Sequence, residues 1–208
     1  MSVLNKIAYY QKRRDEVPNK ELASELAATK DKRGIQEIAE NLWHKNKSVR
    51  SDCLGVLYHI GYINPGLIAG YVDDFLKLLK DKENRMVWGA MIGLATIADE
   101  RSEEIWQHLD EVISAIEQGT LITFVWGIKT LAHVAKADKR YSKKIFPILI
   151  GHLQKCNPRD LPLHAESVRV AVDKRNQAEY LAVVHARQNE LTSSQLTRLK
   201  KVLKDLQV

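Results

Sequence analysis

The sequence predicts an all-α protein, a right-handed α-solenoid in which helix pairs stack on one another and further helices cap the two ends. Apolar residues recur with a period of 37 residues, and signals for helix starts divide the chain at a similar step. We find no alternating apolar and polar run followed by a hairpin turn, which a pair of strands would require. The 208 residues, 45% of them hydrophobic, are enough for a well-buried core.

The first helix of each pair is predicted from three apolar columns whose members recur every 37 residues. Within one repeat the columns stand at i, i+3 and i+7, which places them on one stripe of an α-helix. We expect this stripe to be buried. The columns are Ile35, Val72, Leu109 and Phe146; Ile38, Phe75, Val112 and Leu149; and Leu42, Leu79, Ile116 and Leu153.

The second helix of each pair follows the same step and adds a column in which three of four members are small. A glycine inside a helix costs about 0.5–1 kcal/mol relative to alanine, so we expect glycines such as Gly89 and Gly93 where neighbouring helices approach closely. The columns are Leu54, Met91, Ile128 and Ala165; Leu57, Leu94, Leu131 and Val168; Ile60, Ile97, Val134 and Ala171; and Cys53, Ala90, Gly127 and His164.

Helix-start and helix-end signals agree with this division of the chain. We interpret the sequence as one domain, 1–208, with N-terminal capping helices in 1–31, four repeats of 37 residues in 32–173, and a C-terminal capping helix pair in 174–208. The signals are Asn46 before a helix, Asn64-Pro65, Gly119-Thr120, Asn157-Pro158, and a capping box at 192–195.

The second helices resemble the HEAT repeat, whose pattern has Val-Arg early and a spaced small-x-x-Ala-Leu-x-x-Leu core. Thr123-Phe124 and Asp160-Leu161 replace Val-Arg in the third and fourth repeats, so the similarity weakens there. It implies a solenoid that binds another protein. The matching residues are Val49-Arg50, Cys53, Val56-Leu57 and Ile60 in the first repeat, and Met86-Val87, Ala90, Gly93-Leu94 and Ile97 in the second.

Charge is distributed unevenly along the chain. Thirty-two Lys and Arg against 26 Asp and Glu give a formal charge of +6, which favours polyanionic partners. Residues 136–175 hold ten basic and four acidic residues, whereas 99–118 hold seven acidic and one basic. The basic stretch is therefore the one in which a nucleic-acid contact would be expected.

The residues do not form a signature of catalysis, of a metal site or of a cofactor site. Cys53 and Cys156 lack metal-ligand spacing, the histidines lack paired spacing, and "GIKT" at 127–130 lacks the earlier glycine of a phosphate-binding loop. No apolar run approaches the roughly 20 residues of a membrane span, and the N-terminus lacks a signal-peptide core. We expect a cytoplasmic protein without a cofactor, and the sequence gives no positive case for an enzyme.

Polar positions on the second helices of a solenoid usually line its concave side, so they are the candidate binding surface. Asp52 and Tyr62 fall on the same inner face, while Trp43 and Trp106 on the first helices are interpreted as packing residues. The predicted binding residues are Trp126, Lys129, His133, Lys136, His59, Trp88 and Arg169.

Two functions from different classes fit these residues. The first is a non-enzymatic module or scaffold that presents its concave face to a protein partner. The alternative is a nucleic-acid-binding protein or a repair enzyme, because bacterial HEAT-like DNA alkylation repair glycosylases are similar in length and positive charge. The chain lacks the tryptophan-and-aspartate motif of those glycosylases: only Trp106 is followed closely by an aspartate, Asp110. No catalytic residue is assigned.

Overall fold

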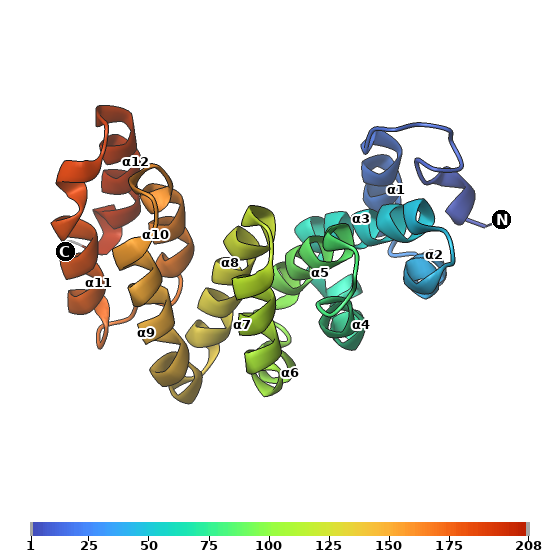
Figure 1. Ribbon diagram of the computed structural model, residues 1–208. Coiled ribbons are helices and arrows are strands. Elements are labelled where there is room, and N and C mark those ends of the chain that lie inside the picture. Colours follow the sequence, from blue (N-terminus) through green and yellow to red (C-terminus); the bar gives the residue numbers. More distant parts are fainter. Residues whose placement is uncertain (1, 207–208) are drawn as a thin grey trace. The chain divides into compact units, whose positions relative to one another are not determined.

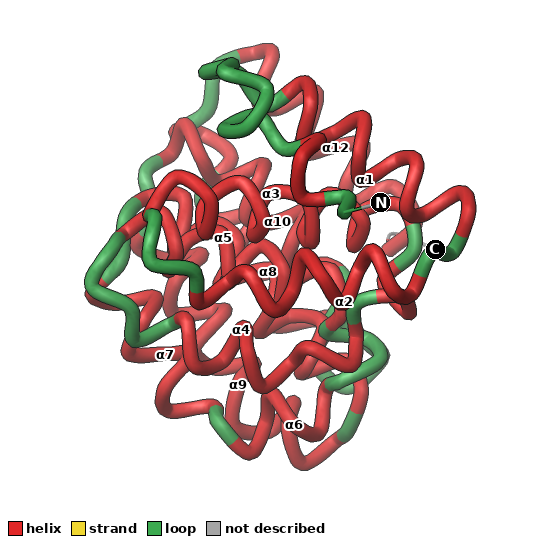
Figure 2. Tube along the Cα trace, turned by 90° about the vertical axis from the view of Figure 1, so that its right-hand side faces the viewer, coloured by secondary structure: helices red, strands yellow, loops and turns green. Residues whose placement is uncertain are grey.

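The computed structural model describes residues 2–206, and over this range the chain consists of helices joined by turns and loops (Figure 1). Figure 2 shows the same elements coloured by type, and within the described range none is a strand. The prediction of an all-α protein is confirmed. Contacts divide the chain into two compact units, Met1–Gly127 and Ile128–Val208, with the boundary inside helix α8 (Leu121–Ala137).

Unit 1 contains α1 to α7 and the beginning of α8. In this unit α3 contacts α1, α2 and α5, and α4 contacts α5. Short 3₁₀ turns connect several of the helices. The helices are α1 (Val17–Thr29), α2 (Lys32–Glu40), α3 (Lys47–Ile63), α4 (Val72–Leu78), α5 (Asn84–Ile97), α6 (Ser102–Gln107) and α7 (Leu109–Gln118), and the 3₁₀ turns are Leu4–Lys6, Asn41–Trp43, Pro65–Leu67 and Ala69–Tyr71.

The apolar columns form the core of unit 1, as predicted. The first-helix members of the second and third repeats, Val72, Phe75, Leu79, Leu109, Val112 and Ile116, expose at most 6% of their surface. The second-helix members Leu54, Leu57, Ile60, Met91, Leu94 and Ile97 are buried as well. Stacking of helix faces with a 37-residue step therefore accounts for the packing of this unit.

Glycines stand where two helices of unit 1 come too close for a side chain. A Cβ atom added at Gly89 would lie 2.6 Å from Cδ2 of Leu54, and one added at Gly93 would lie 2.9 Å from Cε1 of Phe75. At Gly127 an added Cβ would overlap Ile116 of α7. The close approach gained at each position offsets the cost of a helical glycine, as expected from the sequence.

Two of the predicted helix-start signals of unit 1 have different outcomes. The Asn46 side chain accepts a hydrogen bond of 2.9 Å from the backbone N–H of Ser48 and caps α3. Pro65 instead begins a 3₁₀ turn, and Asn64 makes no side-chain capping bond there. The α-helix starts only at Val72, because Gly66 and Gly70 disfavour helical backbone in between.

Unit 2 consists of the remainder of α8 and four further helices. Here α9 contacts α10 and α11, and α10 contacts α12. All predicted column members of this unit are buried, from Ile128 to Ala171. The elements are α9 (Lys139–Lys155), α10 (Leu161–Arg169), α11 (Gln177–Ala186) and α12 (Ser193–Leu203), with 3₁₀ turns at Pro158–Asp160, Gln188–Glu190 and Lys204–Leu206.

The last two helices are anchored by specific contacts. The Tyr180 hydroxyl donates a hydrogen bond of 2.8 Å to the buried backbone oxygen of Ala165, which ties α11 to α10. The predicted capping box is present at the start of α12, where the backbone N–H of Thr192 donates to Oε1 of Gln195 over 2.8 Å. Among the described helices we find no segment with the length and apolarity that crossing a bilayer requires.

Two histidines meet inside unit 2. The rings of His152 on α9 and His164 on α10 are nearly perpendicular, with centroids 4.5 Å apart. Burial, followed by the nearby His164 and Arg187, lowers the pKa of His152 to about 4. Burial likewise lowers the pKa of His164, although Asp160 opposes the effect. Both rings are therefore neutral at pH 7.

These histidines are expected to make unit 2 sensitive to acid. Because the pKa of His152 falls from 6.5 in the unfolded chain to about 4 in the folded one, the unfolded chain takes up the proton first. The contribution of the neutral His152 ring to the free energy of unfolding is therefore fully present above pH ~6.5 and is lost as the pH falls toward ~4. The expected decline is about 1–2 kcal/mol, because the ring is partly exposed. Urea unfolding followed by circular dichroism at several pH values measures the decline. A His152→Gln variant should show a shallower slope, and an unchanged slope would contradict this assignment.

Candidate functional site

Five aromatic side chains of unit 1 follow one another across its second helices, and we refer to them as the aromatic row. Each comes from a helix that is the second of its pair. The aromatic row consists of Tyr58, His59 and Tyr62 on α3, Trp88 on α5 and Trp126 on α8.

Ring contacts run through the whole row. The centroid of Tyr58 lies 6.3 Å from that of Trp88 and 6.1 Å from that of Tyr62, and the centroid of Tyr62 lies 5.7 Å from that of Trp126. These separations are typical of interacting aromatic pairs. Tyr58 is buried, Trp88 and Trp126 are half-buried, and Tyr62 is 47% exposed. The row therefore has a buried base and a surface that a ligand can reach.

Glu16, which precedes α1, joins the N-terminal segment to the aromatic row. Its Oε1 accepts a hydrogen bond of 3.4 Å from the Tyr58 hydroxyl, and the same oxygen lies 3.4 Å from a guanidinium nitrogen of Arg85. Its Oε2 lies 3.7 Å from Nε2 of His59. The Arg85 guanidinium also lies over the Trp88 ring, 5.1 Å from the centroid, which is cation–π geometry.

Burial sets the protonation of the row. It lowers the pKa of His59, an effect that Glu16 opposes, and it raises the pKa of Tyr62 to about 12 with the help of Glu16. Burial raises the pKa of Tyr58 in the same direction. The tyrosines are therefore neutral hydrogen-bond donors at physiological pH, and the charges beside the row belong to Glu16 and Arg85.

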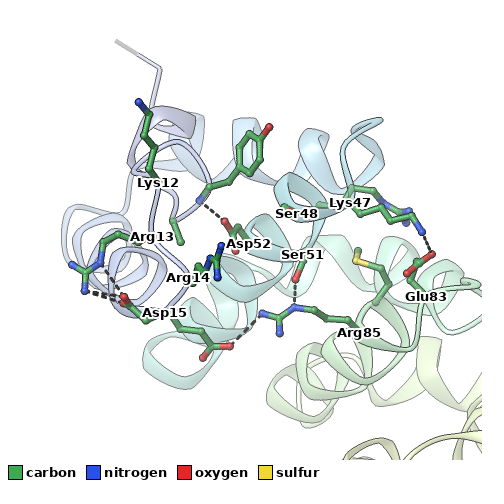
Figure 3. Close-up of a pocket in the computed structure, with 15 residues that line it drawn as sticks. Lys12, Arg13, Arg14, Asp15, Lys47, Ser48, Ser51, Asp52, Glu83 and Arg85 are labelled. Carbon is green, nitrogen blue, oxygen red and sulfur yellow. Dashed lines mark hydrogen bonds and ion pairs between the residues drawn. The ribbon is translucent and has the colours of Figure 1, made fainter.

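A cavity of about 570 Å³ opens beside the aromatic row, and we refer to it as the polar cavity (Figure 3). It lies between the segment 8–16 and the first turns of α3 and α5, and Arg85 and Glu16 belong to both features. Its size is in the range of ligand pockets. The lining residues are Ala8, Tyr9, Lys12, Arg13, Arg14, Asp15, Glu16, Lys47, Ser48, Arg50, Ser51, Asp52, Glu83, Arg85 and Met86.

Most of the charged groups around the polar cavity are paired with one another. Arg13 pairs with Asp15 at 3.0 Å, Lys47 pairs with Glu83, and Arg50 pairs with Asp81 just outside the lining. Burial alone would raise the pKa of Asp81, but the backbone N–H of Glu83 and the Arg50 guanidinium hold it below the usual range. The walls of the cavity are therefore held in place by hydrogen-bonded ion pairs.

The structure brings three of the predicted site residues together. His59, Trp88 and Trp126 all belong to the aromatic row, and both tryptophans are half-buried. The other four lie in unit 2: Lys129, His133 and Arg169 are half-buried and Lys136 is exposed. Their part in binding stays a prediction.

Sequence reasoning misjudged or missed several residues. Trp43, interpreted as a packing residue, lies in the 3₁₀ turn Asn41–Trp43 and is 50% exposed, because the helix has ended before it. Tyr58, Glu16 and Arg85 were not identified. The i, i+4 spacing of Tyr58 and Tyr62 on one predicted helix was the available signal for the first of them. Within residues 2–206 we find no group of three or more His, Cys, Asp or Glu placed to hold a metal ion.

Comparison with known proteins places the repeats in a family. Residues 32–172 match the Cnd1 family, described as non-SMC mitotic condensation complex subunit 1. No curated protein matches the sequence.

Several solved structures have a similar fold. A designed armadillo repeat protein in complex with the peptide (KR)4 has a TM-score of 0.63 at 13% identity, over 89% of this chain and 85% of that one. An engineered protein has a TM-score of 0.60 at 18% identity, over 99% and 98%. Kap121p bound to Ste12p has a TM-score of 0.64 at 15% identity, over 91% of this chain and 21% of that one. The likeness shows a helical-repeat fold of the armadillo and HEAT class.

Proposed function

The chain belongs to the Cnd1 family, and on this basis we propose that it is a non-enzymatic interaction module that holds a segment of a partner protein against the aromatic row. The observation that carries the proposal is the row itself. Aromatic side chains from three successive second helices stand in mutual contact and keep reachable surface at Tyr62, Trp88 and Trp126. Such rigid aromatic groups are enriched among the residues that dominate protein interfaces.

The similar structures support a peptide or protein as the partner. The designed armadillo protein was solved in complex with a peptide, and Kap121p with another protein, Ste12p. A surface built from second helices gives an extended segment one contact in each repeat. The terminal helices, within 1–31 and 174–208, would then act as caps that keep the ends of the repeat core out of water.

Selection of random peptides on the immobilised full chain tests this function. We expect peptides that bind the wild type, with binding weakened roughly tenfold to a hundredfold by Trp88→Ala and by Trp126→Ala, because truncating a central aromatic contact typically costs about 2 kcal/mol or more. Isothermal titration calorimetry of each synthesised peptide measures the loss.

Trp43→Ala is the matched control, because Trp43 is exposed and does not belong to the aromatic row. It should bind the selected peptides as the wild type does. Circular dichroism verifies that each variant is folded. Failure to recover any peptide, or equal binding by the Trp88→Ala and Trp126→Ala variants, would count against the proposed function.

A further inference from the structure

The lining of the polar cavity carries more positive than negative charge. Six of its residues are Lys or Arg and four are Asp or Glu, as the list of lining residues shows. Four of the six cations are paired with Asp15, Glu83, Asp81 and Glu16. The other two, Lys12 and Arg14, form no ion pair with any residue in the described range 2–206. The cavity therefore keeps two cations whose charge is available to a ligand.

The segment that carries these two cations is fixed in place. Lys12 has a φ of 55°, and the backbone N–H groups of Lys12 and Arg13 donate to the oxygens of Tyr9 and Ala8 over 3.1 and 2.9 Å. This pattern is a Schellman-type turn, in which the left-handed position is usually a glycine. A lysine in this conformation is strained relative to a glycine, and the surrounding contacts must offset the strain.

Asp52 provides the main contact that holds the turn. Its Oδ2 accepts a hydrogen bond of 2.7 Å from the backbone N–H of Tyr9, and its Oδ1 accepts one of 3.0 Å from the amide of buried Asn19. Asn19 in turn accepts from the backbone N–H of Ala8 at 2.9 Å. Both oxygens of Asp52 are therefore occupied by neutral donors, and Asp52 and Arg14 both line the cavity (Figure 3).

Arg85 connects this cavity to the aromatic row. Its guanidinium lies over the ring of Trp88 in the aromatic row. Within the cavity lining it pairs with Glu16 and hydrogen-bonds the hydroxyl of Ser51 (Figure 3). A segment bound along the row can thus extend directly into the cavity.

We infer that the partner segment is acidic: a Glu or Asp side chain, a few residues from an aromatic or aliphatic one, enters the polar cavity and pairs with Arg14 and Lys12. This inference rests on the proposed function and specifies its partner. Arg14 has five donors in a planar fork that fits a carboxylate, and Lys12 adds a second charge. The designed armadillo protein, by contrast, was solved with the basic peptide (KR)4.

The test uses the peptides selected on the full chain. We expect Glu or Asp to be enriched at a fixed spacing from an aromatic or aliphatic residue. Replacing that Glu by Gln, or that Asp by Asn, should weaken binding to the wild type roughly tenfold, the usual scale for a charge-assisted contact. The double variant Arg14→Ala, Lys12→Ala should bind the acidic peptide more weakly than the wild type by a similar factor. Its affinity for the corresponding Gln or Asn peptide should be nearly unchanged. Calorimetry of both peptides with both proteins measures the four affinities.

Arg33→Ala is the matched control, because Arg33 is an exposed arginine of α2 outside the cavity lining. It should leave both peptides unaffected. Peptides that depend on Trp88 but carry no acidic residue, or that bind the Arg14 and Lys12 double variant equally well, would overturn the inference and leave the proposed function standing. Selected peptides whose binding does not depend on Trp88 or Trp126 would contradict both this inference and the proposed function. Tighter binding of a fluorescein-labelled single-stranded oligonucleotide than of the acidic peptide, lost in the double variant, would also overturn it in favour of a nucleic acid.

Discussion

Replacing Leu94 by alanine is expected to lower the free energy of unfolding by about 2–5 kcal/mol, the usual range for a buried leucine. Leu94 is fully buried on α5, and α5 packs against both α3 and α4, so we expect that the cavity left by truncation does not close by local collapse. Trp43, Trp88, Trp106 and Trp126 all lie in unit 1, so urea unfolding followed by tryptophan fluorescence reports directly on this unit.

The same substitution at Leu121 is the control, because this leucine of α8 is 68% exposed. Its change in unfolding free energy should stay within about 0.5 kcal/mol. A loss at Leu94 no larger than that at Leu121 would mean that the 37-residue register is wrong.

Removing residues 176–208 is expected to unfold unit 2 and to cause aggregation. The deletion takes away α11 and α12, whose Tyr180, Val184, Leu199 and Leu203 are all buried, and exposes the apolar face of α10. An end repeat without its cap presents apolar surface to water, and exposed apolar surface of this kind drives association. Size-exclusion chromatography with light scattering, together with circular dichroism melting, measures the outcome.

A full-length chain with Lys200→Ala and Lys201→Ala is the control for this deletion, because both lysines are exposed on α12. It should remain as monodisperse as the wild type and have the same melting temperature. A soluble shortened chain with an unchanged melting curve would show that these helices do not cap the repeats.

The core could be predicted from the sequence, because it depends on a period that is repeated four times. A single apolar residue such as Ile97 says little, but its recurrence as Ile60, Val134 and Ala171 fixes both the helix and its buried face. The glycines follow from the same alignment, since Gly89 and Gly93 stand where helices approach. The period therefore predicts which face of each second helix is buried, and it places Trp88 and Trp126 on these helices.

The polar cavity could not be predicted, because it depends on a segment that lies outside the period. The turn at Lys12 has a left-handed backbone without the glycine that would announce it, and it is held by Asp52, 40 positions later in the chain. Glu16 reaches Arg85 across a still larger separation. Contacts between an irregular segment and distant helices leave no regular pattern in a sequence.

The contacts between neighbouring helices also determine how quickly the chain can fold. In unit 1 the helices that pack most extensively on one another are close in the sequence, as α3 with α5 or α4 with α5, and in unit 2 α10 packs on α9 and α12. Closing a short loop costs little entropy, so each helix pair can form before the next, and folding can nucleate at several points along the chain. Local contacts of this kind favour fast folding, which shortens the time during which the apolar columns stand exposed to other molecules.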